Sequence, residues 1–159
     1  MLSAKSGKVK ILFLCTGNSC RSQMAEGWAR QLKGKVIDAY SAGTEPHGMN
    51  HLALLAMKEV DVDISAHHSK SVDELSGIEF DYVVTVCDHA HESCPVFAGG
   101  TKVMHVGFPD PPKLAEEAGA TTDEEALPHY RRVRDAIREF VEGLPASLES
   151  DVGNSAACG

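Results

Sequence analysis

A cysteine and an arginine separated by five residues stand where an early apolar run ends. Residues 15–22 read Cys-Thr-Gly-Asn-Ser-Cys-Arg-Ser and follow the run 9–14. A loop of this length, built from small residues, can wrap a tetrahedral oxyanion with its backbone N–H groups. Arg21 can bind two oxygens at once, and Cys15 supplies a sulfur nucleophile. The spacing therefore predicts a site that binds an oxyanion and attacks it.

The backbone of this loop is expected to hold the oxyanion. The oxyanion-binding residues are predicted to be Thr16, Gly17, Asn18, Ser19, Cys20, Arg21 and Ser22. Gly17 and Asn18 tolerate the left-handed backbone angles that such a loop needs. A helix predicted to begin at Ser22 adds free N–H groups and a favourable dipole. The same field is expected to lower the pKa of Cys15 from about 8.5 to about 6, and Ser22 can donate a hydrogen bond to the thiolate. Cys20 is expected to pack rather than react.

Two further thiols and a carboxylate follow later apolar runs. Cys87 ends the third run, Cys94 lies seven residues later, and Asp110 follows the fourth. Adjacent parallel strands lie about 4.8 Å apart, so their carboxyl ends would bring Cys87 close to Cys15. A protonated Asp110 could give a proton to a departing oxygen, which requires a pKa above its ordinary value near 3.9.

Apolar runs alternate with helical periodicity along the chain. Strands are predicted at 9–14, 35–41, 82–86 and 102–106, and helices at 22–33, 50–60, 71–75 and 123–143. This alternation favours right-handed crossovers and a parallel sheet. We expect a single α/β domain over residues 8–145, with a four-stranded parallel sheet in the order 2-1-3-4 and helices on both faces. Residues 146–159 are expected to form a flexible tail.

Composition limits the class of protein. The chain has 159 residues, five cysteines and a formal net charge of −8. No apolar stretch is long enough for a membrane span and no secretory signal is evident, so a cytoplasmic protein is expected. In a reducing compartment cysteines favour catalysis, redox chemistry or metal over structural disulfides. The negative charge argues against nucleic acid or an anionic membrane as a partner. A monomer without a cofactor is expected.

The loop resembles the signature of low-molecular-weight tyrosine phosphatases and, more closely, that of thiol-dependent arsenate reductases with the same fold. The resemblance lies in residues 15–27, Ser41-Ala-Gly-Thr44, Val83-Val-Thr-Val-Cys87 and Gly107-Phe-Pro-Asp-Pro111. It implies the low-molecular-weight phosphatase fold and reduction of arsenate to arsenite, with thioredoxin as the partner. It also implies catalytic roles for Cys15, Arg21, Cys87, Cys94 and Asp110.

In the reaction that this resemblance implies, Cys15 attacks arsenic and Asp110 protonates the leaving hydroxyl. Cys87 then attacks Cys15 and arsenite leaves, after which Cys94 attacks Cys87 and thioredoxin reduces the resulting disulfide. Seven helical residues rise about 10.5 Å, whereas disulfide-linked Cα atoms lie roughly 4.4–6.8 Å apart. If residues 88–94 are helical, we therefore predict that they unwind when this bridge forms.

Two other functions fit parts of the pattern. A phosphatase on the same scaffold, acting on phosphotyrosine or small phosphate esters, would need only Cys15, Arg21 and Asp110. It would leave Cys87 and Cys94 without a role, although weak phosphatase activity could accompany reduction. A non-enzymatic arsenic or redox sensor would use the thiols only as ligands.

A metal site is the remaining alternative for residues 87–94. Cys87, His89, His91 and Cys94 are potential zinc ligands, but their spacing matches no common closed zinc site, so no metal is expected. The three histidines His47, His67 and His68 are expected at the surface, and Cys158 as a free thiol in the tail.

The resemblance also raises the question of a cation. Some reductases of this kind bind potassium beside the loop, at positions that correspond to Asn18, Glu26 and Ser41 together with a fourth, acidic residue. This chain has Lys70 where that acid is expected. The hypothesis is that the Lys70 ammonium replaces the cation.

Overall fold

A parallel sheet forms the centre of the molecule. The computed structural model describes residues 7–87 and 100–150, without the side chain of residue 150. Its four strands are β1 (Val9–Cys15), β2 (Ile37–Gly43), β3 (Tyr82–Thr85) and β4 (Lys102–His105). All three strand pairs are parallel and the order is β2-β1-β3-β4, so the predicted sheet is confirmed.

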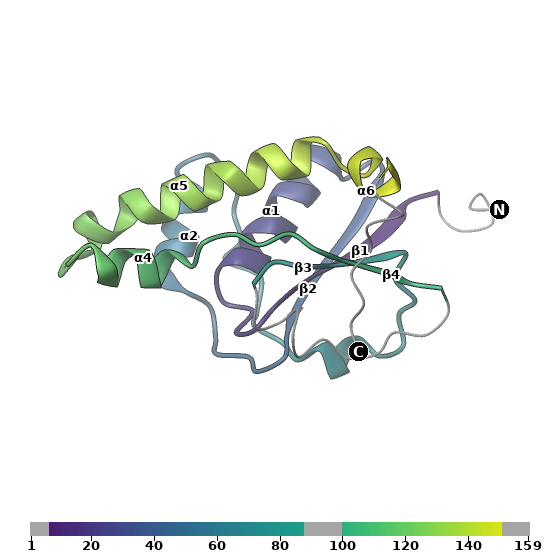
Figure 1. The fold of residues 1–159 in the computed structure, drawn as a ribbon, viewed down its shortest axis with the longest axis horizontal. Helices are drawn as coiled ribbons and strands as arrows, with labels where there is room; N and C mark the ends of the chain where they lie inside the picture. Colours follow the sequence, from purple (N-terminus) through teal and green to yellow (C-terminus); the bar gives the residue numbers. More distant parts are fainter. Residues whose placement is uncertain (1–6, 88–99, 151–159) are drawn as a thin grey trace.

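Helices pack mainly against one side of this sheet. They are α1 (Arg21–Lys33), α2 (His51–Lys58), α4 (Pro111–Glu117), α5 (Asp123–Glu142) and α6 (Ala146–Ser150), with a short 3-10 helix η2 (Val72–Leu75). In Figure 1, α1, α2, α5 and α6 lie above the sheet, and the teal turn of η2 lies below it. The chain is therefore an α/β domain in which helical elements lie on both sides of the sheet, most of them above it and the short η2 below.

The central strand β1 is buried on both faces from Ile11 onward, which explains the unbroken apolar sequence of residues 11–14. Ile11, Leu12, Phe13 and Leu14 are fully buried. In the register with β3, Leu14 pairs with Thr85, and Val86 N–H donates to the Leu14 carbonyl (2.9 Å). Cys15, the last residue of β1, and Cys87, two residues beyond the end of β3, therefore lie together at the carboxyl edge of the sheet.

Helices α1 and α5 pack against each other and support the carboxyl edge of the sheet. Trp28 of α1 is buried, and its indole N–H donates to the Arg134 carbonyl of α5 (3.0 Å). Gly27 lets helix α1 lie close to the side chain of Ile64, because a Cβ at this position would be only 2.7 Å from Ile64 Cγ2.

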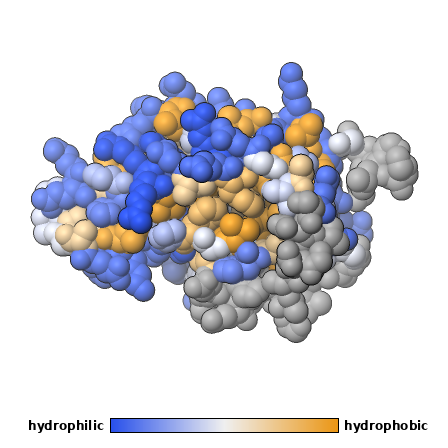
Figure 2. Space-filling model, turned by 45° about the horizontal axis from the view of Figure 1, so that its top comes forward, coloured by the Kyte–Doolittle hydropathy of each residue, from blue (hydrophilic) through white to orange (hydrophobic). Residues whose placement is uncertain are grey.

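Figure 2 shows hydrophilic side chains over the upper part of one face and a continuous apolar area below them.

The structure differs from the sequence-based expectation at three elements. Strand β2 runs two residues later than predicted, because Val36 N–H closes a turn onto the Lys33 carbonyl (2.9 Å). Helix α4 was not predicted; it begins at Pro111, and proline suits the first turn of a helix, where its missing N–H has no partner. Helix α6 occupies the start of the stretch expected as a tail, and Leu148 is buried in the core.

Several expectations lie outside the described residues: the zinc ligands His89 and His91, Cys94, the unwinding of 88–94, and Cys158. Within the described ranges, no helix is both long and apolar enough to cross a membrane.

Candidate active site

The loop between β1 and α1 has the conformation that its sequence predicts. Asn18 is fully buried and has a φ of 47°, in the left-handed region. Its amide Nδ2 donates to Ser22 Oγ (2.8 Å), and its Oδ1 accepts from Lys70 N–H (2.9 Å) and Gln23 Nε2 (3.0 Å). These bonds fix the turn. Ser22 accepts from Asn18, which leaves its hydroxyl hydrogen for another acceptor.

Residues 44–50, the outer segment, run along the outside of this loop. The N–H groups of Thr44, Glu45, His47 and Asn50 donate to the carbonyls of Cys15, Thr16, Gly17 and Ser19, at 3.2, 2.8, 2.9 and 3.0 Å. The loop carbonyls therefore point outward and leave the amides for the interior, where the Gly17 N–H reaches the Cys15 sulfur. This is the arrangement of an anion-binding nest.

The guanidinium group of Arg21 is held by one hydrogen bond, while its Nε has no acceptor in the part of the chain that the structure describes. Its Nη1 donates to the Phe108 carbonyl (2.9 Å), and its Nη2 lies 3.6 Å from Asp110 Oδ1. Its Nε is buried and has no hydrogen-bond partner among the described residues. A buried donor without an acceptor is costly, and an oxyanion in the loop would supply one.

A cavity of about 720 Å³ opens beside this loop. The described residues that line it are Thr16, Arg21, Cys87, Gly107, Phe108, Pro109, Asp110, Lys113, Leu114 and Glu117. The cavity is far larger than one tetrahedral oxyanion. Asp110 lies on its wall as the N-cap residue of α4, with a side chain 39% exposed. The expected proton donor and the expected anion ligand thus share one cavity.

The two thiols Cys15 and Cys87 are both buried and are hydrogen-bonded to each other. The Cys87 thiol, burial and any negative charge on Cys87 raise the pKa of Cys15, against smaller lowering effects of Arg21 and the Gly17 N–H. The prediction of a lowered pKa is therefore wrong, because it left out the second thiol and the burial. The two sulfurs cannot readily carry charge at once, so at most one of them is a thiolate.

Thr16 ties the loop to the second thiol. Its Oγ1 lies 3.3 Å from Cys87 Sγ, and either atom could be the donor. A hydroxyl that donates to this sulfur stabilises its thiolate form. Cys20, by contrast, is 3% exposed, and burial raises the pKa of its thiol. Cys20 is thus held as a neutral packing group.

Behind the loop, Gln23 joins three segments of the chain. It is fully buried; its Nε2 donates to the Asn18 carbonyl (3.2 Å) and the His68 carbonyl (3.1 Å), and its Oε1 lies 2.9 Å from His67 Nδ1. Because Gln23 donates through Nε2, Oε1 is an acceptor and His67 Nδ1 carries the hydrogen. Burial lowers the pKa of His67. The surface position expected for His67 is wrong, since its side chain is 13% exposed, whereas His47 and His68 are exposed.

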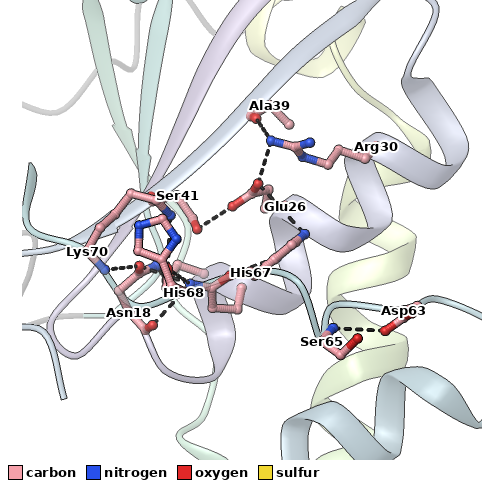
Figure 3. A network of polar contacts seen from close by, with 12 residues as sticks. Asn18, Glu26, Arg30, Ala39, Ser41, Asp63, Ser65, His67, His68 and Lys70 are labelled. Atoms are coloured by element: carbon pink, nitrogen blue, oxygen red, sulfur yellow. Dashed lines mark hydrogen bonds and ion pairs between the residues drawn. The ribbon is translucent and has the colours of Figure 1, made fainter. Parts of the chain in front are cut away.

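Lys70 lies in the same network, which Figure 3 shows from close by. Its Nζ donates to the Ser41 and His68 carbonyls, both at 3.1 Å. Glu26 is buried; it accepts from the Ser41 hydroxyl and pairs with Arg30 (2.8 Å). Burial lowers the pKa of Lys70, while Glu26 acts in the opposite direction. Among the residues described, no group of three or more His, Cys, Asp or Glu side chains could hold a metal ion.

Sequence reasoning missed the groups that support the site. They are the Thr16 hydroxyl, the Gln23 amide, the Phe108 carbonyl and the outer segment. The outer segment and Phe108 act through backbone atoms, which carry no residue-type signal. Gln23 did carry one, because an amide in the first turn of a helix that packs on the core requires buried partners.

Comparison with known proteins places this geometry in a family. The model of the low molecular weight phosphotyrosine protein phosphatases matches residues 10–154. An arsenate reductase 2 of Staphylococcus saprophyticus is 47% identical over 135 residues, which are 85% of this chain and 95% of that protein. An arsenate reductase of Halalkalibacterium halodurans is 48% identical over 135 residues, 85% of this chain and 94% of its own.

Solved structures agree with the sequence matches. An arsenate reductase in the phosphate binding state superposes with a TM-score of 0.67 at 30% identity, over 88% of this chain and 98% of that one. An arsenate reductase in the oxidized state gives 0.69 at 30% identity, over 87% and 98%. The chain therefore belongs to the low molecular weight phosphotyrosine protein phosphatase family, and within it to the group of the arsenate reductases.

Proposed function

We propose that the protein reduces arsenate to arsenite, with Cys15 as the nucleophile and a thiol relay as the source of electrons. One observation carries the proposal: the buried thiols of Cys15 and Cys87 are hydrogen-bonded to each other, and Cys87 lines the cavity together with Thr16 and Arg21 of the oxyanion loop. Hydrolysis needs only one thiol, whereas reduction by two electrons needs a pair. The names of the relatives agree with reduction.

In the first step, arsenate lies in the loop and accepts hydrogen bonds from the inward amides and from Arg21 Nε. The thiolate of the pair is Cys15, which attacks arsenic and forms the S–As bond. One oxygen departs as water, carrying the proton that arsenate brought and a second proton given by the carboxyl group of Asp110, which regains a proton from solvent. Arg21 holds Asp110 at the cavity, so the carboxyl group is already near the departing oxygen.

In the second step, the Cys87 sulfur attacks Cys15 Sγ. The S–As bond breaks and its electron pair passes to arsenic, which leaves as arsenite with the Cys87 proton, while a Cys15–Cys87 disulfide remains. Thr16 Oγ1 lies 3.3 Å from Cys87 Sγ. As Cys87 gives up its proton, the Thr16 hydroxyl can donate to the sulfur and stabilise the developing negative charge. Cys94 then attacks Cys87 and frees Cys15, and the thiols of thioredoxin reduce the Cys87–Cys94 bridge.

The partners follow from this chemistry. A disulfide at the foot of a buried loop is inaccessible to a protein reductant, so the relay would carry the oxidation to Cys94. A protein dithiol such as thioredoxin is then the natural reductant. The relay also needs reduced thiols at rest, which fits a cytoplasmic protein acting as a monomer without a cofactor.

The test couples arsenate to thioredoxin, thioredoxin reductase and NADPH. The wild-type protein is expected to oxidise one NADPH for each arsenate consumed. Cys94→Ser is expected to complete one turnover and then stop, because the Cys15–Cys87 disulfide stays out of reach of thioredoxin. Sustained turnover of Cys94→Ser with thioredoxin would contradict the relay.

Hydrolysis of phosphate esters remains a second candidate, favoured by the family and by a cavity much larger than an oxyanion. It would use Cys15, Arg21 and Asp110 and leave the relay idle. Cys87→Ser separates the two activities: it should abolish arsenate turnover and retain hydrolysis of para-nitrophenyl phosphate.

Lys70 is proposed to take the place of a monovalent cation. Its Nζ donates to the Ser41 carbonyl beside Glu26, and its backbone N–H donates to Asn18, so the ammonium supports the side of the loop from which a cation would act. The protein should then work without potassium.

A further inference from the structure

The outer segment is fastened at its end by one side chain, Asn50. The Asn50 N–H donates to the Ser19 carbonyl of the oxyanion loop (3.0 Å). Its Oδ1 caps helix α2 by accepting from the N–H groups of Leu52 (2.9 Å) and Ala53 (3.0 Å). Its remaining polar group, Nδ2, donates to the hydroxyl of Tyr130 (3.2 Å). Asn50 therefore joins the loop, α2 and α5.

Tyr130 makes this junction rigid. It lies in α5, which packs against α1, α2 and α4, and it is 3% exposed. Burial disfavours the ionised form of its phenol and raises the pKa of Tyr130, and the neighbouring Cys20 and Asp110 add to this effect. The neutral phenol is thus a fixed acceptor for Asn50. No step of the proposed reaction uses either residue.

We propose that Tyr130 and Asn50 are positioning residues for the oxyanion loop. Tyr130 holds the Asn50 amide, Asn50 holds the Ser19 carbonyl outward, and the amides that follow this carbonyl stay turned toward the anion. Without the hydroxyl of Tyr130, Nδ2 of Asn50 loses its buried acceptor and the end of the outer segment loosens. The inference rests on the proposed function only in taking this loop as the oxyanion site.

The test measures binding of inorganic phosphate to the reduced full-length protein by calorimetry. Tyr130→Phe removes only the hydroxyl, and Asn50→Ser keeps a helix-capping oxygen while removing Nδ2. Each variant is expected to bind phosphate about three- to tenfold more weakly. Both substitutions remove the same hydrogen bond, the one between Asn50 Nδ2 and the Tyr130 hydroxyl. The dissociation constant of the double variant for phosphate should therefore be no higher than that of the single variant that binds phosphate less tightly. Tyr40→Phe is the control, since its hydroxyl contacts Asp38 in β2 (3.3 Å).

A second readout separates positioning from general destabilisation. For Tyr130→Phe the KM for arsenate should rise by the same factor as the dissociation constant for phosphate, with kcat at saturation unchanged. Wild-type phosphate affinity in Tyr130→Phe, a double variant weakened by the product of the single effects, or an equal loss in Tyr40→Phe would overturn the inference. If the wild type binds phosphate but reduces no arsenate, the proposed function fails, and the phosphate comparison still decides the role of Tyr130.

Discussion

The two sides of the oxyanion loop are built in opposite ways. Behind the loop, the polar groups of Gln23, Asn18 and Lys70 have hydrogen-bond partners within the protein. At the cavity, the Nε of Arg21 has no acceptor among the described residues, and two thiols compete for one negative charge. The buried network therefore holds the loop in one conformation. At the cavity, the free donor favours binding of an anion and the thiol pair supplies the reactive groups.

Loss of the nucleophile tests the cavity side most severely. Cys15→Ser should lower arsenate turnover by about 10³-fold or more, because a serine hydroxyl is neither ionised here nor able to form the disulfide. Thioredoxin-coupled NADPH oxidation measures this. The matched control is Cys158→Ser, which should retain wild-type turnover. Loss of activity in the control would instead assign a role to the last cysteine.

Arg21→Lys tests whether the unmatched donor matters. Lysine keeps the charge but loses Nε and the paired donors that reach Phe108 and the anion, so kcat/KM for arsenate should fall by about 100-fold or more. Arg138→Lys, on the exposed side of α5, is the control with the same chemical change. If Arg21→Lys retained full activity, a positive charge alone would explain binding.

Lys70→Asp tests the network behind the loop. The wild type should respond by less than about twofold when potassium replaces sodium at equal ionic strength. The variant exchanges the ammonium for a carboxylate facing Glu26, so its activity should fall and then recover several-fold with potassium. Strong potassium stimulation of the wild type would contradict the proposed role of Lys70.

The smallest expected effect concerns stability. Burial lowers the folded-state pKa of His67, so the neutral form stabilises the fold above the unfolded pKa near 6.5, and this stability is lost as pH falls below it. Between pH 7.5 and 5.5 the loss from His67 should not exceed about 1.4 kcal/mol, the free energy of one proton over the single pH unit below the unfolded pKa. Urea unfolding at the two pH values measures this loss. The free energy of unfolding should change less with pH in His67→Asn than in the wild type, and as much as in the wild type in His68→Asn. Equal slopes in all three would show that His67 does not titrate as proposed.

The sequence allowed the sheet and the loop to be predicted because both depend on local pattern. Residues 11–14 are apolar throughout because β1 is buried on both faces there, and Asn18 takes the left-handed angle that its residue type allows. The pKa of Cys15 could not be predicted in the same way. It depends on the contact with Cys87, 72 positions away in the sequence, and on burial that only the folded chain produces.

Helix α4 and the support of the loop escaped prediction for a related reason. Asp110-Pro111-Pro112 reads equally well as a turn or as the start of a helix. The Tyr130 hydroxyl meets Asn50 only because α5 packs over α2. Residues with chemistry of their own were therefore visible in the sequence, while those that act by holding others required the structure.

The central claim is that Cys15 begins a reaction that ends in a disulfide outside its loop. Mass spectrometry of the reduced full-length protein after one equivalent of arsenate, without a reductant, tests it most directly. The account predicts one equivalent of arsenite, a Cys87–Cys94 linkage and a free Cys15 thiol. Unchanged arsenate with all cysteines reduced, or a linkage that leaves out Cys87, would contradict it.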